Sequence, residues 1–231
     1  MQVQKTNNKF EKEWDKHGET EWEYFSTEIK ERVSYFLSQR LKGKNLDIGG
    51  GWYLHYPNST VVDLSSVCLE KNPANEKIHF DLETLVEGNH LPLENHSFDS
   101  ATLISAWQYI ANSDALVKEL RRVLKSGSEV YIINGQGAGV SEYIRSDSRT
   151  FGIQRYFNSK GYDTLIESIP TPDGNTEEFL SLCVSMPQKT LLGRESVVRN
   201  KKQRILKNKT IAESPRIFSK PYIDYKINKV E

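Results

Sequence analysis

Short apolar segments recur along the chain at intervals that suit strands joined by helices or loops. They are rich in Val, Ile, Leu and aromatic residues and are bounded by Gly, Pro, Asn or Ser, which is the pattern of buried strands. The predicted strands are residues 45–48, 60–64, 77–81, 100–105, 129–133, 163–169 and 179–186.

Apolar residues at spacings of three and four predict helices around these strands. The longest predicted helix covers residues 19–41, and the sequence Lys42-Gly43-Lys44 ends it with Gly and cationic residues. A second helix is predicted over 112–124, followed by a turn at Ser126-Gly127, and a short third helix over 151–160. The apolar face of the first helix holds Trp22, Phe25, Ile29, Val33, Phe36 and Leu37.

Alternation of strands with helices is typical of an α/β fold with a parallel sheet and helices on both faces. The last two predicted strands are joined only by a polar loop, PTPDGNTEE, which is too short for a crossover helix. Because parallel strands need such a crossover, these two strands are expected to form an antiparallel hairpin at one edge of a seven-stranded sheet.

Charge divides the chain into an acidic body and a basic tail. The 231 residues have a net charge of zero, but residues 188–231 hold 12 Lys/Arg and 4 Asp/Glu. We expect three parts, namely an N-terminal helical cap or lid at 1–43, a core at 44–187 and a basic extension at 188–231. The extension is interpreted as a solvated segment or as a contact surface for an acidic partner, a phosphate backbone or a second copy of the chain.

Composition excludes several classes of protein. The chain has no apolar run of about 18 residues, so no membrane-spanning helix is expected, and its polar N-terminus argues against a secretory signal. Cys68 and Cys183 form neither a metal-ligand spacing nor a disulfide framework, which favours a reducing, cytoplasmic location. The five His residues lack a close ligand set, so no metal site is predicted.

The loop after the first predicted strand carries the most informative residues, Asp47-Ile48-Gly49-Gly50-Gly51. Glycine lets the backbone approach a ligand closely, and the end of the next strand presents Asp63, whose carboxylate can accept two ribose hydroxyls. A dinucleotide fingerprint starting at Gly49 would need Gly at Leu54, and no P-loop run occurs. S-adenosylmethionine, which carries no phosphate, remains as the third nucleotide ligand.

Several segments, in order, resemble the class I S-adenosylmethionine-dependent methyltransferases, in particular the methyltransferase type 11-like, small-molecule branch. The resemblance covers about residues 44–186 and implies a Rossmann-like, doubly wound sheet. Its segments are NLDIGGG, VVDLS, HFDLETL, LPLENHSFDSATLISAWQYI and LVKELRRVLKSGSEVYIIN.

The resemblance implies a role for each matching residue. Gly49, Gly50 and Gly51 would approach the methionine part of the cofactor, and Asp47 would orient this loop and reach toward the cofactor ammonium. The other residues implied in cofactor binding are Asp63 and Leu64 at the ribose, Asp81 and Leu82 at the adenine, and Ser105 near the sulfonium.

Two departures from the family pattern affect the site. Tyr53 stands where the family has a third glycine, and the segment 47–63 is short. The aromatic residues Tyr53, His55 and Tyr56 then either rebuild one wall of an active pocket or block it, in which case the protein is a non-catalytic relative. His, which many small-molecule relatives carry in the stretch after the fourth strand, is also absent from residues 107–110.

Methyl transfer from S-adenosylmethionine to an oxygen or nitrogen of a small-molecule or peptide-like acceptor is the predicted function. Tyr109 is the candidate catalytic residue, as a group that orients the acceptor, and Trp107 and Tyr143 are the candidate substrate-binding residues. Two alternatives stay open. One is a degenerate methyltransferase-fold binding protein, and the other is an RNA methyltransferase that uses the basic tail.

Overall fold

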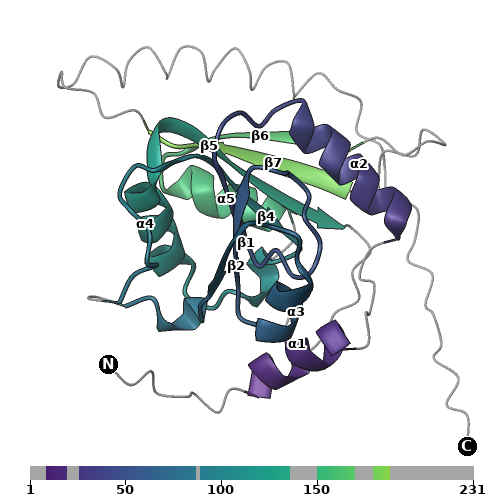
Figure 1. Cartoon of the computed structure of the whole chain (residues 1–231). Coiled ribbons are helices and arrows are strands. Elements are labelled where there is room, and N and C mark those ends of the chain that lie inside the picture. The colour runs from purple at the N-terminus through teal and green to yellow at the C-terminus, as the bar shows by residue number, and fades with distance from the viewer. Residues whose placement is uncertain (1–8, 20–25, 87–88, 136–149, 170–178, 188–231) are drawn as a thin grey trace, which may run out of the picture. The chain divides into compact units, whose positions relative to one another are not determined.

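A seven-stranded sheet forms the centre of the protein (Figure 1). The computed structural model describes residues 9–19, 26–86, 89–135, 150–169 and 179–187. The strand order is β3-β2-β1-β4-β5-β7-β6, which confirms the predicted α/β, doubly wound fold class. The strands are β1 (Asn45–Ile48), β2 (Ser59–Asp63), β3 (Glu76–His79), β4 (Phe98–Ile104), β5 (Leu124–Gly135), β6 (Asp163–Ser168) and β7 (Phe179–Ser185).

The first five strands are parallel, and β7 is antiparallel to both of its neighbours. β7 lies between β5 and β6, so β6 forms the edge of the sheet and pairs with β7 as the predicted hairpin. The carboxyl ends of the parallel strands therefore all lie on one side of the sheet, and the loops that follow these strands gather there.

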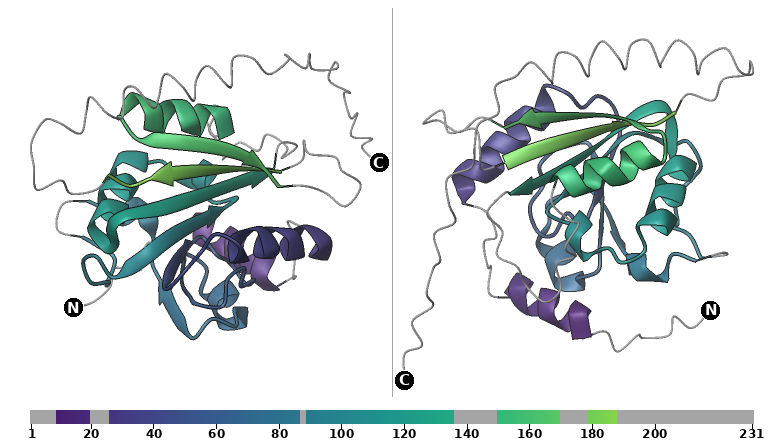
Figure 2. Two further views of the ribbon diagram at one scale, coloured as in Figure 1. Left: turned by 90° about the horizontal axis from the view of Figure 1, so that it is seen from above. Right: turned by 180° about the vertical axis from the view of Figure 1, so that it is seen from behind.

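Helices cover both faces of the sheet, and Figure 2 shows α5 (Thr150–Ser159) and α2 (Thr27–Ser38) on opposite sides. Side chains along β4 alternate between the two faces, as the strand geometry requires. Leu103 joins the core under α4 (Ser113–Val123) and α5, while Ile104 joins the core under α2.

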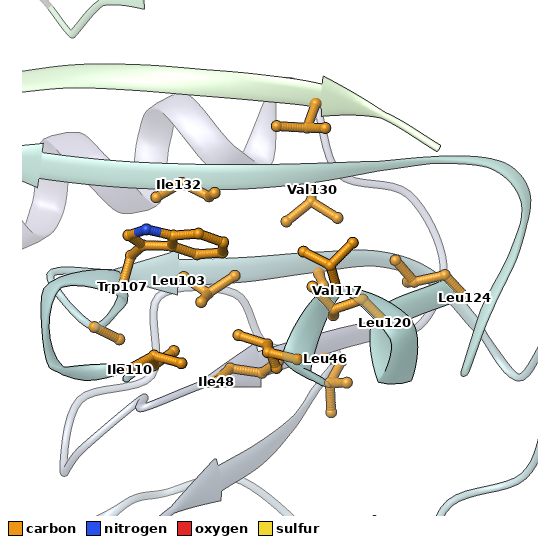
Figure 3. Packing of buried hydrophobic residues seen from close by; sticks show 14 of the residues in the cluster. Leu46, Ile48, Leu103, Trp107, Ile110, Val117, Leu120, Leu124, Val130 and Ile132 are labelled. Carbon is orange, nitrogen blue, oxygen red and sulfur yellow. The ribbon is translucent and has the colours of Figure 1, made fainter. Parts of the chain in front are cut away.

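The larger core lies on the α4 and α5 face (Figure 3). The fully buried side chains of Leu46, Leu103 and Ile132 come from three neighbouring strands. Val117 and Leu120 of α4 pack onto them at helical spacing, so one apolar stripe of this helix closes the core.

Buried polar side chains link β1 to its two neighbours on the opposite face. The Asn45 side-chain amide donates to Ser59 Oγ on β2 at 2.9 Å and to Thr102 Oγ1 on β4 at 3.0 Å. Its carbonyl oxygen accepts from Ser100 Oγ at 2.9 Å. Because buried polar groups must be hydrogen-bonded, this network satisfies Asn45 at the centre of the sheet.

The first predicted helix is wrong in extent. The structure has α1 (Lys9–Glu19) and a separate α2, with Ser26 capping α2 by accepting from the Ile29 N–H. A Ser at that position favours a helix start over continuation, and the sequence pattern alone did not register it. Trp22 and Phe25 lie outside the described residues, as do the predicted loop PTPDGNTEE and the basic extension.

Two other elements differ from the prediction. β5 begins at Leu124 and continues through the predicted turn at Ser126-Gly127, where a register irregularity against β4 absorbs Gly127 at φ +79°. The short helix α3 (Ser66–Lys71), capped by Ser65, follows β2 and was not predicted. Within the described ranges, none of the helices is long and apolar enough to cross a membrane.

Replacing Leu120 by Ala tests the core under α4. Leu120 is fully buried, so we expect the Leu120→Ala variant to lose about 2–5 kcal/mol of unfolding free energy in urea titrations. Leu165→Ala is the matched control, because Leu165 on β6 is 48% exposed and its loss should cost less than about 0.5 kcal/mol. Equal effects of the two variants would contradict this assignment of the core.

Candidate active site

A cavity of about 200 Å³ opens at the carboxyl ends of the parallel strands. It lies where the strand order reverses, since β2 and β3 lie on one side of β1 and β4 and β5 on the other. This switch point is where open α/β sheets bind ligands. Its lining comes from the loops after β1, β2, β3 and β4 and from helices α1 and α2.

The glycine loop after β1 forms the floor of this cavity. Gly49 and Gly51 have φ values of +66° and +58°, a region that favours residues without a Cβ. A Cβ on Gly49 would also come within 2.7 Å of the Ala106 Cβ, so the loop after β4 can pack directly on the loop after β1. The predicted residues Gly49, Gly50 and Gly51 all line the cavity.

Asp63 joins the loop after β1 to the loop after β2. One carboxylate oxygen accepts the Gly51 N–H and the other accepts the Ser65 N–H, each at 2.8 Å. Burial raises the pKa of Asp63 despite these hydrogen bonds. Each carboxylate oxygen has two lone pairs, so the side chain can accept further donors from a ligand in the cavity that it lines.

Asp47 lies behind the glycine loop rather than in the cavity lining. It is 1% exposed and accepts from Thr102 Oγ1 at 2.8 Å. Burial raises its pKa to about 7, and the negative charge of Asp63 adds to this effect. The arrangement fits the predicted role in orienting the loop, because a Cβ on Gly50 would come within 2.8 Å of Asp47 Oδ2.

The loops after β2 and β3 form the end of the cavity farthest from β4 along the sheet. Asp81 caps the short helix η1 (Leu82–Thr84) by accepting the Glu83 N–H at 3.0 Å. Leu64, Asp81 and Leu82, all predicted cofactor residues, line the cavity here together with Phe80. A carboxylate beside apolar side chains can take a flat, mostly apolar ring with one amino group.

The end of β4 contributes a strained residue. Ser105 has φ +50°, which is uncommon for a residue other than glycine, and its N–H donates to the Ile133 carbonyl at 2.8 Å. Such backbone strain persists where surrounding contacts fix it, often at functional sites. Ser105 and Tyr109 both line the cavity, and the Tyr109 ring contacts Trp14 edge-on at 5.2 Å.

Trp107 does not line the cavity, which corrects its predicted contact with substrate. Its side chain is 3% exposed and its indole packs against Tyr156 and Phe157 of α5, as part of the core in Figure 3. The short helix η2 (Trp107–Tyr109) points this ring toward α5 and leaves Tyr109 on the cavity side. Tyr143 lies outside the described residues.

Helix α1 brings two side chains to the cavity, Trp14 of the predicted cap or lid and His17, which the sequence prediction missed. The helix is attached to α3, because Ser65 Oγ donates to Asp15 at 2.6 Å and Lys71 Nζ donates to the Gly18 carbonyl at 2.7 Å. Trp14 and His17 are three positions apart, which places both on one face of a helix. That spacing is the signal in the sequence that could have indicated His17.

The aromatic residues after the glycine loop form a wall with α2 instead of filling the cavity. Trp52, Tyr53, His55 and Lys30 all line it. The Lys30 ammonium lies 4.2 Å from the centre of the Trp52 ring and 5.3 Å from that of Tyr53. Tyr56, which follows in the same segment, packs against the core under α2. In the described part of the chain, no group of three or more His, Cys, Asp or Glu could hold a metal ion.

Comparison with known proteins identifies the fold. Residues 46–132, which run from β1 into β5, match a family model described as a methyltransferase domain. The predicted resemblance to class I S-adenosylmethionine-dependent methyltransferases is thereby confirmed. No curated protein matches the chain.

Solved structures agree at the level of the fold. A methyltransferase from Aquifex aeolicus is 11% identical with a TM-score of 0.54, and the match covers 74% of this chain and 98% of that one. A methyltransferase from Thermotoga maritima is 13% identical with a TM-score of 0.55, covering 74% and 97%. The [4+2]-cyclase SpnF is 14% identical with a TM-score of 0.50, covering 68% and 82%. A fold shared with a cyclase does not fix the reaction.

The raised pKa of Asp47 predicts how the free energy of unfolding depends on pH. An isolated Asp loses its proton near pH 3.8, as Asp47 does in the unfolded chain, but in the folded protein its pKa is about 7. Folding stability therefore falls as pH rises between these values. We expect Asp47→Asn to remove this loss and to raise the unfolding free energy by about 2–4 kcal/mol at pH 8, with little change at pH 4.

Asp99→Asn is the control for this measurement. The hydrogen bond from Lys125 lowers the pKa of Asp99, so its carboxylate stabilises the protein at neutral pH and this stabilisation is lost in acid. The control should therefore destabilise at pH 8, the opposite sign. Urea titrations from pH 4 to 8 measure both, and an Asp47→Asn effect that is equal at all pH values would contradict the shifted proton.

Proposed function

Since residues 46–132 match a methyltransferase domain, we propose that this chain is an S-adenosylmethionine-dependent methyltransferase. The proposed acceptor is an oxygen or nitrogen atom of a small-molecule or peptide-like substrate. The observation that carries the proposal is the meeting of Asp63, Asp81 and the glycine loop around one cavity at the switch point of the sheet.

The residues present fit the cofactor group by group. Asp63 offers acceptor lone pairs for two neighbouring hydroxyls, as a ribose presents. Asp81, with the apolar side chains of Leu64 and Leu82, suits an adenine ring and its amino group. At Gly51 no atom lies within 4 Å of the place of a Cβ, which leaves room beside the loop for the amino-acid part of the ligand.

Bound S-adenosylmethionine supplies a methyl group on a sulfonium centre, which a nucleophile displaces in line. The protein's part in such a reaction is to position the reactants and to exclude water. Trp14 and Tyr109 provide an aromatic wall on one side of the cavity, and Ser105 and Ala106 provide backbone on another. In this proposal Tyr109 orients the acceptor from that wall.

The open cavity favours a catalytic protein over a non-catalytic relative. Tyr53 and His55 stand in its wall, and their rings contact each other edge-on with centres 4.6 Å apart. Lys30 holds the Tyr53 side of this wall from α2. The cavity that the glycine loop and Asp63 line therefore stays accessible to a ligand.

Calorimetric titration with S-adenosylmethionine and with its demethylated product tests the proposal. We expect both to bind, and Asp63→Ala to weaken binding by about 1–3 kcal/mol because a charge-assisted hydrogen-bonding partner is lost. Asp163→Ala is the control, since Asp163 is an exposed acid on the edge strand β6 and its loss should leave the affinity unchanged. Wild-type protein that binds neither compound would refute the function.

A further inference from the structure

His55 occupies the place where the connection from β1 to β2 meets α2. The connection, residues 49–58, contains no helix, and it places the imidazole against α2 with 8% of the residue exposed. His55 Nδ1 lies 3.3 Å from Ser34 Oγ, and the ring also lines the cavity. One nitrogen of the ring is therefore held by the protein, and the ring itself forms part of a ligand-binding wall.

The contacts of Ser34 fix which nitrogen carries the proton. The Ser34 hydroxyl has a single hydrogen and donates it to the Lys30 carbonyl at 2.8 Å. In its contact with His55 the Ser34 oxygen must then be the acceptor, so Nδ1 is the protonated nitrogen. The neutral imidazole consequently carries its lone pair on Nε2.

Burial keeps this imidazole neutral. Burial and, to a smaller extent, the positive charge of Lys30 lower the pKa of His55 to about 4, against a hydrogen bond with the Lys30 backbone that raises it. At physiological pH, Nε2 is therefore a hydrogen-bond acceptor and not a cation. The ring lines the cavity, where an N–H or O–H group of a ligand or a water molecule can donate to Nε2.

The order of the site along the sheet indicates which part of the ligand reaches His55. Asp81 follows β3, Asp63 ends β2 and the glycine loop follows β1, in the same order as the strands. An adenosyl group with its adenine at Asp81 and its ribose at Asp63 directs the amino-acid end toward the glycine loop. That loop runs directly into the segment of His55.

We propose that His55 Nε2 accepts a hydrogen bond from the ammonium group at the amino-acid end of the cofactor. This inference rests on the proposed function. Asp47, the residue predicted for that ammonium, is behind the glycine loop and engaged by Thr102. The Lys30 ammonium over Trp52 and Tyr53 places positive charge in the same wall, which matches the carboxylate of the same amino-acid group. The Nε2 lone pair and the Lys30 ammonium together suit the ammonium and carboxylate of the amino-acid group.

Two variants of His55 separate a hydrogen bond from simple packing. Gln at this position can place an amide oxygen where Nε2 lies, whereas Asn reaches only as far as Nδ1. The probes are S-adenosylhomocysteine, which carries the amino-acid group, and 5′-methylthioadenosine, which has the adenosyl thioether without it. We expect His55→Asn to weaken S-adenosylhomocysteine about 5- to 30-fold, His55→Gln to retain most of the affinity, and 5′-methylthioadenosine to be unaffected by either.

Other outcomes overturn the inference. Unchanged affinity of His55→Asn for S-adenosylhomocysteine would show that the ammonium has another acceptor and would leave an N–H or O–H of the methyl acceptor as the donor for Nε2. Equal weakening of both probes by both variants would show a packing role. Binding of 5′-methylthioadenosine to the wild type tests the proposed function by itself, so the two failures are distinguishable. Thermal unfolding of each variant checks that the fold is intact.

Discussion

Parallel pairing of β1 with both β2 and β4 is the constraint on which the site depends. It brings the carboxyl ends of these strands to the same side of the sheet, so that the loops after them lie next to one another. The hydrogen bond from the Gly51 N–H to Asp63 then joins two of these loops directly. The cavity follows from this geometry, because neither loop could form it alone.

The same geometry has an energetic cost. Asp47 and Asp63 are both removed from water near each other, and burial raises the pKa of both. Carboxylates in such positions destabilise the folded protein unless partners satisfy them. Thr102, Gly51 and Ser65 supply those partners, and a cationic ligand would offset the remaining cost. The two buried carboxylates thus lower the stability of the folded protein, as is common for residues of functional sites.

The sequence revealed those parts of the fold and the site that depend on local pattern. Strands β1, β2, β4 and β7 were found because they are largely buried and read as apolar runs, and Asp63 and Asp81 because each stands at the end of a predicted strand. His17 and Lys30 were missed because contacts between segments far apart in the sequence, such as that of Asp15 on α1 with Ser65, decide where the helices lie. Trp107 was misplaced because the turn of η2, rather than its position after β4, decides which way the ring points.

The hydrogen bonds of Asn45 have a consequence for how the sheet is assembled. β1 has only four residues, yet it lies inside the sheet, between β2 and β4. If β1 slid by two residues, its hydrophobic face would be unchanged, so apolar packing alone distinguishes poorly between the two alignments. Asn45 would then face Val61 and Thr102 after a slide in one direction, or Pro57 and Phe98 after a slide in the other, so neither alignment keeps all three hydroxyl partners in the buried interior. One buried polar residue thus favours a single pairing for a strand of only four residues.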